Sequence, residues 1–230
     1  WNFNRISYIS DLHLMHRIKN AGCKSKEDVV FTIKKIIDDI LAESTSLTLI
    51  GGDVSSEFSI FELFVKMLRK LAGSGRRTFV FVLGNHELWN FPGLSVDEIV
   101  DKYRTVLKEN GMYLLHNDLF YRNESDDMGI IPYDELIQSD NPAILEKLRC
   151  TRLVILGGLG FSGYNEEFNA NDGVYRATVD RNTEIQESKK FEQLYDKLTD
   201  VLAKKNTVIF THTPKKDWCV DAKCHDNFVY

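Results

Sequence analysis

The chain has 230 residues, of which 43% are hydrophobic and 27% charged, and its formal net charge is -5. A chain of this size and composition can bury its own core without disulfides. Its apolar runs are too short to span a bilayer, and its acidic balance argues against a broad nucleic-acid-binding surface. With scattered cysteines and no secretory signal, we expect a cytoplasmic protein without membrane contacts. Because the first residue is Trp1 rather than methionine, we also expect processing, trimming or incomplete coverage there.

Strands and helices alternate along the first half of the chain. Apolar and β-branched runs predict the strands, and apolar residues at helical spacing predict the helices. Ser25 followed by Asp28 resembles a capping box, which marks the start of the first long helix. The predicted elements are a strand at 5–10, a helix at 25–42, a strand at 47–50, a helix at 58–71, a strand at 78–83 and a helix at 96–110.

The second half is less regular, and no repeat or low-complexity linker separates it from the first. We therefore expect one domain of layered α/β type over residues 1–230. The predicted elements are short paired strands at 113–115 and 119–121, a turn at 123–127, a helix at 141–149, a strand at 153–156, a glycine-rich stretch at 157–163, a loop at 164–182, a helix at 184–204 and a strand at 207–210.

Metal-capable side chains directly follow four of the predicted strands. In open α/β sheets, ligands collect beyond the carboxyl ends of the strands, so short fragments from four loops can converge at one edge. The side chains that follow the strands are Asp11 and His13, then Asp53, then Asn85 and His86, and finally His212.

The types of these side chains fit a metal centre. Carboxylate, imidazole and amide groups together suit Mn, Fe, Zn or Co. Asp11 and His13 are two positions apart, so they share one side of an extended segment and can hold one ion. A carboxylate at Asp53 can bridge two ions, Asn85 offers a carbonyl oxygen, and His86 can stay off the metal as a proton donor. Two ions about 3.5–4 Å apart can clamp a phosphate and activate a water molecule.

Four fragments in this order resemble the calcineurin-like metallophosphoesterase superfamily. They are D-x-H at 11–13, GGD at 51–53, GNHE at 84–87 and THTP at 211–214. GNHE after an apolar strand is the most specific fragment, whereas GGD alone would be weak. The resemblance covers residues 11–214. It implies a two-sheet β-sandwich flanked by helices, with four layers in the order α/β/β/α, and a site for two divalent metal ions.

The resemblance also implies roles for the strand-end residues. It implies Asp11 and His13 on the first metal, Asp53 between the two metals, and Asn85 and His212 on the second. The family hydrolyses phosphomonoesters or phosphodiesters, so we expect a phosphate-ester substrate, ranging from phosphoproteins to nucleotides and nucleic acids.

The remaining histidines and the motif glutamate receive other interpretations. The resemblance implies that His86 acts as an acid or stabilises the transition state, and that it contacts the substrate together with Asn85. Glu87 is more typical of a supporting partner than of a metal ligand. We interpret His16 as an exposed loop histidine, with support for the site as the alternative. We interpret His116 as a turn residue.

The end of the chain departs from the family pattern. The family usually completes its site with a G-H-x-H motif, and this sequence has none before Tyr230. We therefore expect the native chain to continue and this piece to hold an incomplete site with weakened metal binding and reduced or no activity. Cys219, Cys224 and His225 lack the spacing of a zinc site, so we interpret them as loop residues.

The loop at 164–182 is typical of a functional or lid-type loop. Arg176 is a candidate substrate contact, together with Tyr164, Asn165, Asn169 and Asn171, and a solvated loop is the alternative. Two other functions stay open at this point. One is a nuclease or nucleotide phosphodiesterase, and the other is a non-catalytic binding module that keeps the fold.

Overall fold

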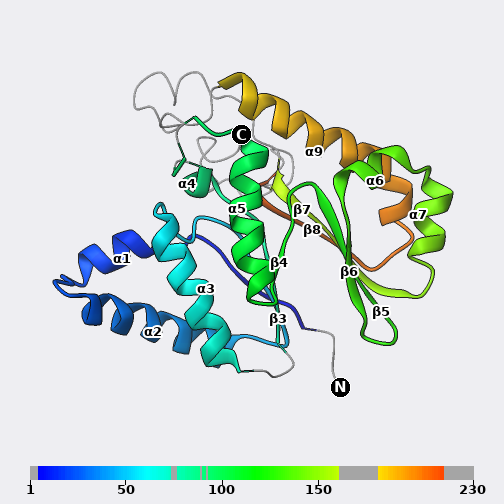
Figure 1. The fold of residues 1–230 in the computed structure, drawn as a ribbon. Helices are drawn as coiled ribbons and strands as arrows, with labels where there is room; N and C mark the ends of the chain where they lie inside the picture. Colours follow the sequence, from blue (N-terminus) through cyan, green and yellow to red (C-terminus); the bar gives the residue numbers. More distant parts are fainter. Residues whose placement is uncertain (1–4, 74–76, 89, 92, 161–180, 215–230) are drawn as a thin grey trace, which may run out of the picture. The chain divides into compact units, whose positions relative to one another are not determined.

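The computed structural model describes residues 5–73, 77–88, 90–91, 93–160 and 181–214. The chain divides into two compact units, residues 1–114 and 115–230, and each contains a four-stranded sheet (Figure 1). Three predicted segments lie outside the described residues: positions 164–180 of the loop predicted at 164–182, which include Arg176, the end of the glycine-rich stretch at 161–163, and the tail at 215–230.

The sheet of the first unit is parallel, with the strand order β1-β2-β3-β4. In its register Ile9 of β1 lies beside Ile50 of β2, and Ile50 lies beside Phe81 of β3. The three strands therefore end at the same edge, and the loops that follow them emerge together. The bounds are Ser7–Ile9 for β1, Leu47–Ile50 for β2, Thr78–Phe81 for β3 and Tyr113–Leu114 for β4.

Within the described residues of the first unit there are five helices, and two of them begin with a capping box. The side chains of Ser25 and Asp28 cap α2 reciprocally with the backbone, and Ser95 and Glu98 do the same for α5. Apolar residues at helical spacing bury one face of each long helix. The helices are α1 (Leu14–Asn20), α2 (Lys26–Glu43), α3 (Phe58–Ala72), α4 (Asn85–Leu88) and α5 (Val96–Glu109).

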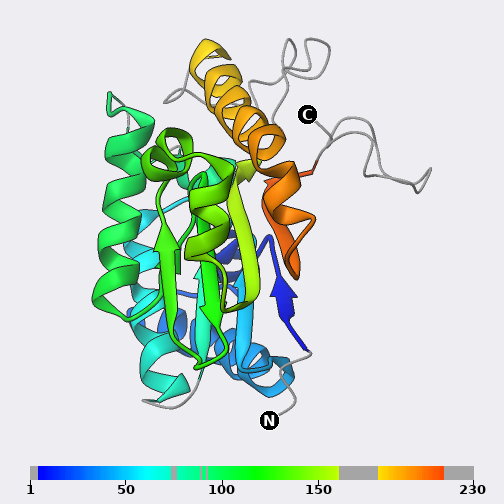
Figure 2. The same ribbon diagram turned by 90° about the vertical axis from the view of Figure 1, so that its right-hand side faces the viewer.

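The sheet of the second unit is mixed, with the order β6-β5-β7-β8. β5 pairs antiparallel with β6 and β7, and β7 pairs parallel with β8. The parallel pair needs a crossover, and the helix α9 lies in that connection and packs along β7 (Figure 2). The bounds are β5 (Asp118–Asn123), β6 (Met128–Ile131), β7 (Thr151–Gly160), β8 (Thr207–Thr213), α6 (Tyr133–Gln138), α7 (Asn141–Lys147) and α9 (Arg181–Leu202).

The mixed α/β class, with two sheets flanked by helices, is confirmed by these elements. Most predicted strands and helices are present with shifted ends. The pairing of 113–115 with 119–121 is wrong, because β4 pairs with β3 and β5 pairs with β6 and β7. The loop prediction is wrong at Arg181 and Asn182, where α9 begins. The elements α1, α4, α6 and β6 were not predicted. The single domain over 1–230 stays a prediction.

Two features of the composition can be checked in the described part of the chain. Cys23 and Cys150 are free thiols there. Within the same residues, no helix combines the length and apolar character that a membrane crossing requires. The cytoplasmic location stays a prediction.

Candidate metal centre

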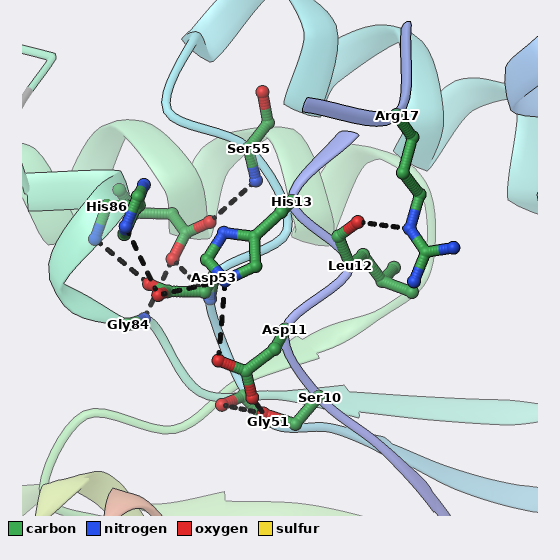
Figure 3. A network of polar contacts seen from close by, with 11 residues as sticks. Ser10, Asp11, Leu12, His13, Arg17, Gly51, Asp53, Ser55, Gly84 and His86 are labelled. Atoms are coloured by element: carbon green, nitrogen blue, oxygen red, sulfur yellow. Dashed lines mark hydrogen bonds and ion pairs between the residues drawn. The ribbon is translucent and has the colours of Figure 1, made fainter. Parts of the chain in front are cut away.

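Three loops meet where β1, β2 and β3 end. The segment after β1 runs beside the segment after β2, because the amide of Asp11 donates to the carbonyl of Gly52 at 3.1 Å and the amide of His13 donates to the carbonyl of Asp53 at 2.9 Å. The third loop joins them through the amide of His86, which donates to Oδ1 of Asp53 at 3.0 Å. The parallel register thus brings Asp11, His13, Asp53 and His86 together (Figure 3).

Asp53 is the centre of this cluster. Its Oδ2 lies 3.9 Å from Nε2 of His13 and 3.6 Å from Nε2 of His86. Nε2 of His13 also lies 3.6 Å from Oδ1 of Asp11. The Asp53 side chain is only 5% exposed, whereas that of Asp11 is 55% exposed, so the cluster has a buried base and an open side.

The spacing of these atoms fits a shared metal ion better than direct hydrogen bonds. Hydrogen bonds between nitrogen and oxygen measure about 2.7–3.2 Å, and the gaps of 3.6–3.9 Å are longer. Ligand atoms held about 2.0–2.2 Å from one ion stand roughly 3.0–3.5 Å apart. Donor atoms of His13, Asp53 and His86 lie within 4.8 Å of one another. An ion would therefore fit between the donor atoms of His13 and Asp53, which lie 3.9 Å apart, with the His86 ring beside it.

Two glycines allow the second and third loops to touch. Gly52 has φ +88°, and a Cβ atom there would lie 2.8 Å from Cα of Gly84. A Cβ atom on Gly84 would in turn lie 2.6 Å from the backbone nitrogen of Asp53. Both distances are shorter than real Cβ contacts, so any larger residue would push Asp53 away from His86.

The backbone of the cluster is strained. Asp11, His13 and Asp53 have positive φ angles of 56°, 43° and 53°, a region that L-residues other than glycine rarely adopt. Such conformations cost on the order of 1–3 kcal/mol each and persist where the surroundings impose them, often at functional sites. Strain at three residues that also supply metal-capable atoms is a second indication that this edge of the sheet is built for function.

We expect the substitution His13→Gly to remove metal binding without lowering stability. His13 precedes α1 as its N-cap but makes no capping hydrogen bond with its side chain. Glycine adopts the φ of 43° without strain, so the free energy of unfolding of the metal-free variant should stay constant or rise by up to about 1 kcal/mol. Urea unfolding in EDTA measures this change, and equilibrium dialysis measures Mn²⁺ binding.

His16→Gly is the matched control for this prediction. His16 is exposed and lies within the right-handed backbone of α1, where glycine lowers stability by about 1 kcal/mol. We therefore expect the free energy of unfolding to fall in His16→Gly and to stay constant or rise in His13→Gly. An equal loss of stability at both positions would contradict the claim that the His13 backbone is strained.

Glu87 connects the loop after β2 with the loop after β3. Its side chain is fully buried. Its Oε2 accepts the amides of Asp53 at 2.9 Å and Gly84 at 2.8 Å, and its Oε1 accepts the amide of Ser55 at 3.0 Å. The structure therefore supports the interpretation of Glu87 as a supporting partner, since both carboxylate oxygens are engaged with backbone N–H groups.

Burial, followed by the negative charge of Asp53, raises the pKa of Glu87 to about 8, although the three backbone N–H groups oppose this rise. The folded chain then holds a proton on Glu87 at pH values where the unfolded chain has lost it. The resulting stabilisation is complete below the ordinary pKa of 4.5 and is lost as the pH rises through about 8.

We therefore expect the metal-free protein to lose stability between about pH 5 and pH 9, by on the order of a few kcal/mol at most. Urea unfolding in EDTA across this range measures the effect. The Glu87→Gln variant cannot titrate at this position, so its stability should depend less on pH over the same range. Equal pH profiles for the two proteins would show that Glu87 is not the titrating group.

Asn85 and His212 are the two remaining predicted ligands. Asn85 is half-buried and begins α4, and His212 lies in β8 of the second unit. Their metal-binding roles, like those of the other predicted ligands, stay predictions.

The loop interpretation of His16 is wrong, because it lies in α1, although it is exposed as expected. His116 lies in the bend before β5, but it is buried and its Nε2 is 3.3 Å from Oε2 of Glu187.

The sequence did not point to several residues that support the cluster. The Ser10 hydroxyl donates to the Asp11 carboxylate and lies 3.3 Å from the carbonyl of Gly51. The Arg17 guanidinium donates to the carbonyl of Leu12 at 2.7 Å and fixes the turn between Asp11 and α1. A serine next to a metal-capable aspartate was the only available signal, and nothing in the sequence indicated Arg17.

Comparisons with known proteins show the family of the chain and a fold similar to its own. The family model described as calcineurin-like phosphoesterase matches residues 5–229, which confirms the resemblance found in the motifs. The crystal structure of phosphopantetheinyl hydrolase (PptH) from Mycobacterium tuberculosis is similar, with a TM-score of 0.50 and 16% sequence identity over 97% of this chain and 73% of that chain. This likeness supports the fold alone. A search of curated proteins found no match.

Proposed function

Because the chain belongs to the calcineurin-like phosphoesterase family, we propose that it hydrolyses phosphate esters with two divalent metal ions bound beyond the ends of its strands. The observation that carries this proposal is the arrangement around Asp53. This buried carboxylate lies within 3.9 Å of Nε2 of His13 and within 3.6 Å of Nε2 of His86, at the meeting point of three strand-end loops.

The family resemblance suggests a role for each residue. Asp11 and His13 would hold one ion, and Asp53 would bridge to a second ion held by Asn85 and His212. When bound, the two ions would clamp the phosphate, lower the pKa of the attacking water and stabilise the leaving oxygen. Mn, Fe or Zn suits this mixture of carboxylate, imidazole and amide donors.

His86 is the proposed proton donor to the leaving oxygen. Its backbone is fixed because its amide donates to Oδ1 of Asp53 at 3.0 Å, and its ring is partly exposed. An acid must be held within hydrogen-bond reach of the atom that it protonates. Asn85, the preceding residue, is half-buried and would orient the phosphate from the same short helix.

The experiment that tests the function is hydrolysis by the full chain with Mn²⁺ or in EDTA. Nitrophenyl phosphate mono- and diesters test the reaction. A comparison of single-stranded DNA, RNA, cyclic dinucleotides and phosphopeptides then defines the substrate class. The net charge of -5 favours small or protein substrates over long nucleic acids. Metal-dependent release of nitrophenol is expected. Binding of Mn²⁺ and phosphate without turnover of any substrate would contradict the proposed hydrolase activity and favour a non-catalytic binding module.

A further inference from the structure

Tyr103 lies in none of the metal-binding motifs, yet its hydroxyl is connected to two of the three loops. It is fully buried in α5. Its Oη donates to the main-chain carbonyl of Glu87 at 3.0 Å and accepts from Nδ2 of Asn90 at 3.1 Å. Oδ1 of Asn90 accepts the amide of Phe58 at 3.1 Å. Phe58 begins α3, which follows the Asp53 loop, and Glu87 and Asn90 belong to the His86 loop and its continuation.

The hydroxyl is not needed to fill the core. The Tyr103 ring makes edge contacts with the rings of Phe58 and Phe61, at centroid distances of 5.0 and 4.7 Å, and a phenylalanine would make the same contacts. Burying a hydroxyl is unfavourable unless it is hydrogen-bonded. Burial, followed by the charge of Glu87, raises the pKa of Tyr103, so the hydroxyl keeps its proton and donates at every working pH.

The carbonyl that receives this hydrogen bond belongs to the residue that holds the site together. The Glu87 side chain accepts the amides of Asp53, Ser55 and Gly84, while its main chain is held by Tyr103. A displacement of Glu87 would therefore move Asp53 directly. Mutation of a group that holds a metal ligand in place without touching the metal typically lowers metal affinity by about 10–100-fold.

We propose that Tyr103 is a positioning residue for the metal centre, and that its hydroxyl keeps the Asp53 loop and the His86 loop in register through Glu87 and Asn90. This inference rests on the proposed function for the presence of a metal. The mechanical link between Tyr103 and Asp53 does not depend on it, because every bond in the link is formed by the protein itself.

The test is the Tyr103→Phe variant of the full chain. We expect its Mn²⁺ affinity, measured by isothermal titration, to fall by about 10-fold. At saturating Mn²⁺ its turnover should recover to within about two-fold of wild type, because the catalytic groups are unchanged. In the metal-free protein, hydrogen exchange at the amides of Asp53, Ser55 and Gly84 should become faster, which requires no metal.

Two further variants separate positioning from stability. Ile99→Val trims a buried side chain one helical turn before Tyr103 and lowers the melting temperature without touching the hydroxyl network. It should leave Mn²⁺ affinity unchanged. Asn90→Ala removes the other bond of the hydroxyl, and the double variant Asn90→Ala/Tyr103→Phe should lose less affinity than the product of the two single losses.

The outcomes are distinct. Unchanged Mn²⁺ affinity and unchanged exchange at Asp53 in Tyr103→Phe, or an equal loss of affinity in Ile99→Val, would overturn the positioning role. If the wild-type chain binds no Mn²⁺, the proposed function fails. The exchange rates of the Asp53, Ser55 and Gly84 amides then decide the role of Tyr103 alone.

Discussion

Phosphoester hydrolysis by the Asp53→Asn variant is expected to fall by about 10³-fold at saturating Mn²⁺. The Asp53 carboxylate lies near both His13 and His86, at 3.9 and 3.6 Å. Asparagine keeps the shape and one oxygen that can accept the His86 amide, but it has no charge and cannot bridge two cations through two oxygens. Turnover of a nitrophenyl phosphodiester and elemental analysis of bound Mn²⁺ measure the two losses.

The fold of this variant should survive. The negative charge of Asp53 helps to raise the pKa of Glu87, which means that the Asp53 charge opposes a second negative charge at this buried site. Removing one charge should therefore leave the melting temperature in EDTA unchanged or higher. Asp118→Asn is the matched control, because Asp118 is equally buried, at 4% exposure, and its carboxylate accepts the amides of His116 and Tyr133 in the second unit.

The control variant should keep at least about half of the activity, since Asp118 has no place in the proposed chemistry. Retention of more than about a tenth of the activity and the full metal content by Asp53→Asn would contradict the bridging role.

The Glu87→Gln variant is expected to unfold with a free energy about 1–3 kcal/mol lower than wild type. The carboxyl accepts three backbone N–H groups, and it can do so in either protonation state because each oxygen keeps a lone pair. An amide nitrogen cannot accept. The single oxygen of glutamine can therefore accept either from the amides of Asp53 and Gly84 or from the amide of Ser55. At least one buried N–H group then has no acceptor.

Urea unfolding in EDTA at pH 7 measures this loss, and Mn²⁺ titration should show weaker binding as well, because Asp53 and Gly84 are no longer held in place. Glu62→Gln is the control. Its partly exposed carboxylate pairs with Lys66 at 2.8 Å, and such surface pairs contribute about 0–1 kcal/mol. Equal losses of unfolding free energy in Glu62→Gln and Glu87→Gln would show that the buried hydrogen bonds of Glu87 contribute no more to stability than a surface ion pair.

The sequence predicted the cluster well because its signals are local. Each candidate residue follows an apolar strand directly, and parallel strands of similar length must end at one edge. The register Ile9–Ile50–Phe81 is the physical reason why Asp11, Asp53 and His86 meet. The glycines between strand and ligand are equally local signals, since only a residue without a side chain permits the contact between Gly52 and Gly84.

The same local signals could not predict which distant strands pair with each other. The strands at 113–114 and 118–123 are close in sequence, which suggested a hairpin, but each pairs with distant strands, and no local pattern records that choice. The role of Tyr103 was hidden for a similar reason, because in the sequence it is one more apolar position of an amphipathic helix. Only the partners of its hydroxyl, Glu87 and Asn90, distinguish it.

The contiguity of the first unit has a consequence for the order of events at the ribosome. All strands of its sheet, together with Asp11, His13, Asp53 and His86, lie within residues 1–114, whereas His212 belongs to the second unit. His212 lies 98 residues after residue 114 (212 − 114), so at synthesis rates of about 5–20 residues per second it follows roughly 5–20 s later. The nascent protein therefore has time to bring Asp11, His13, Asp53 and His86 together before His212 has been translated.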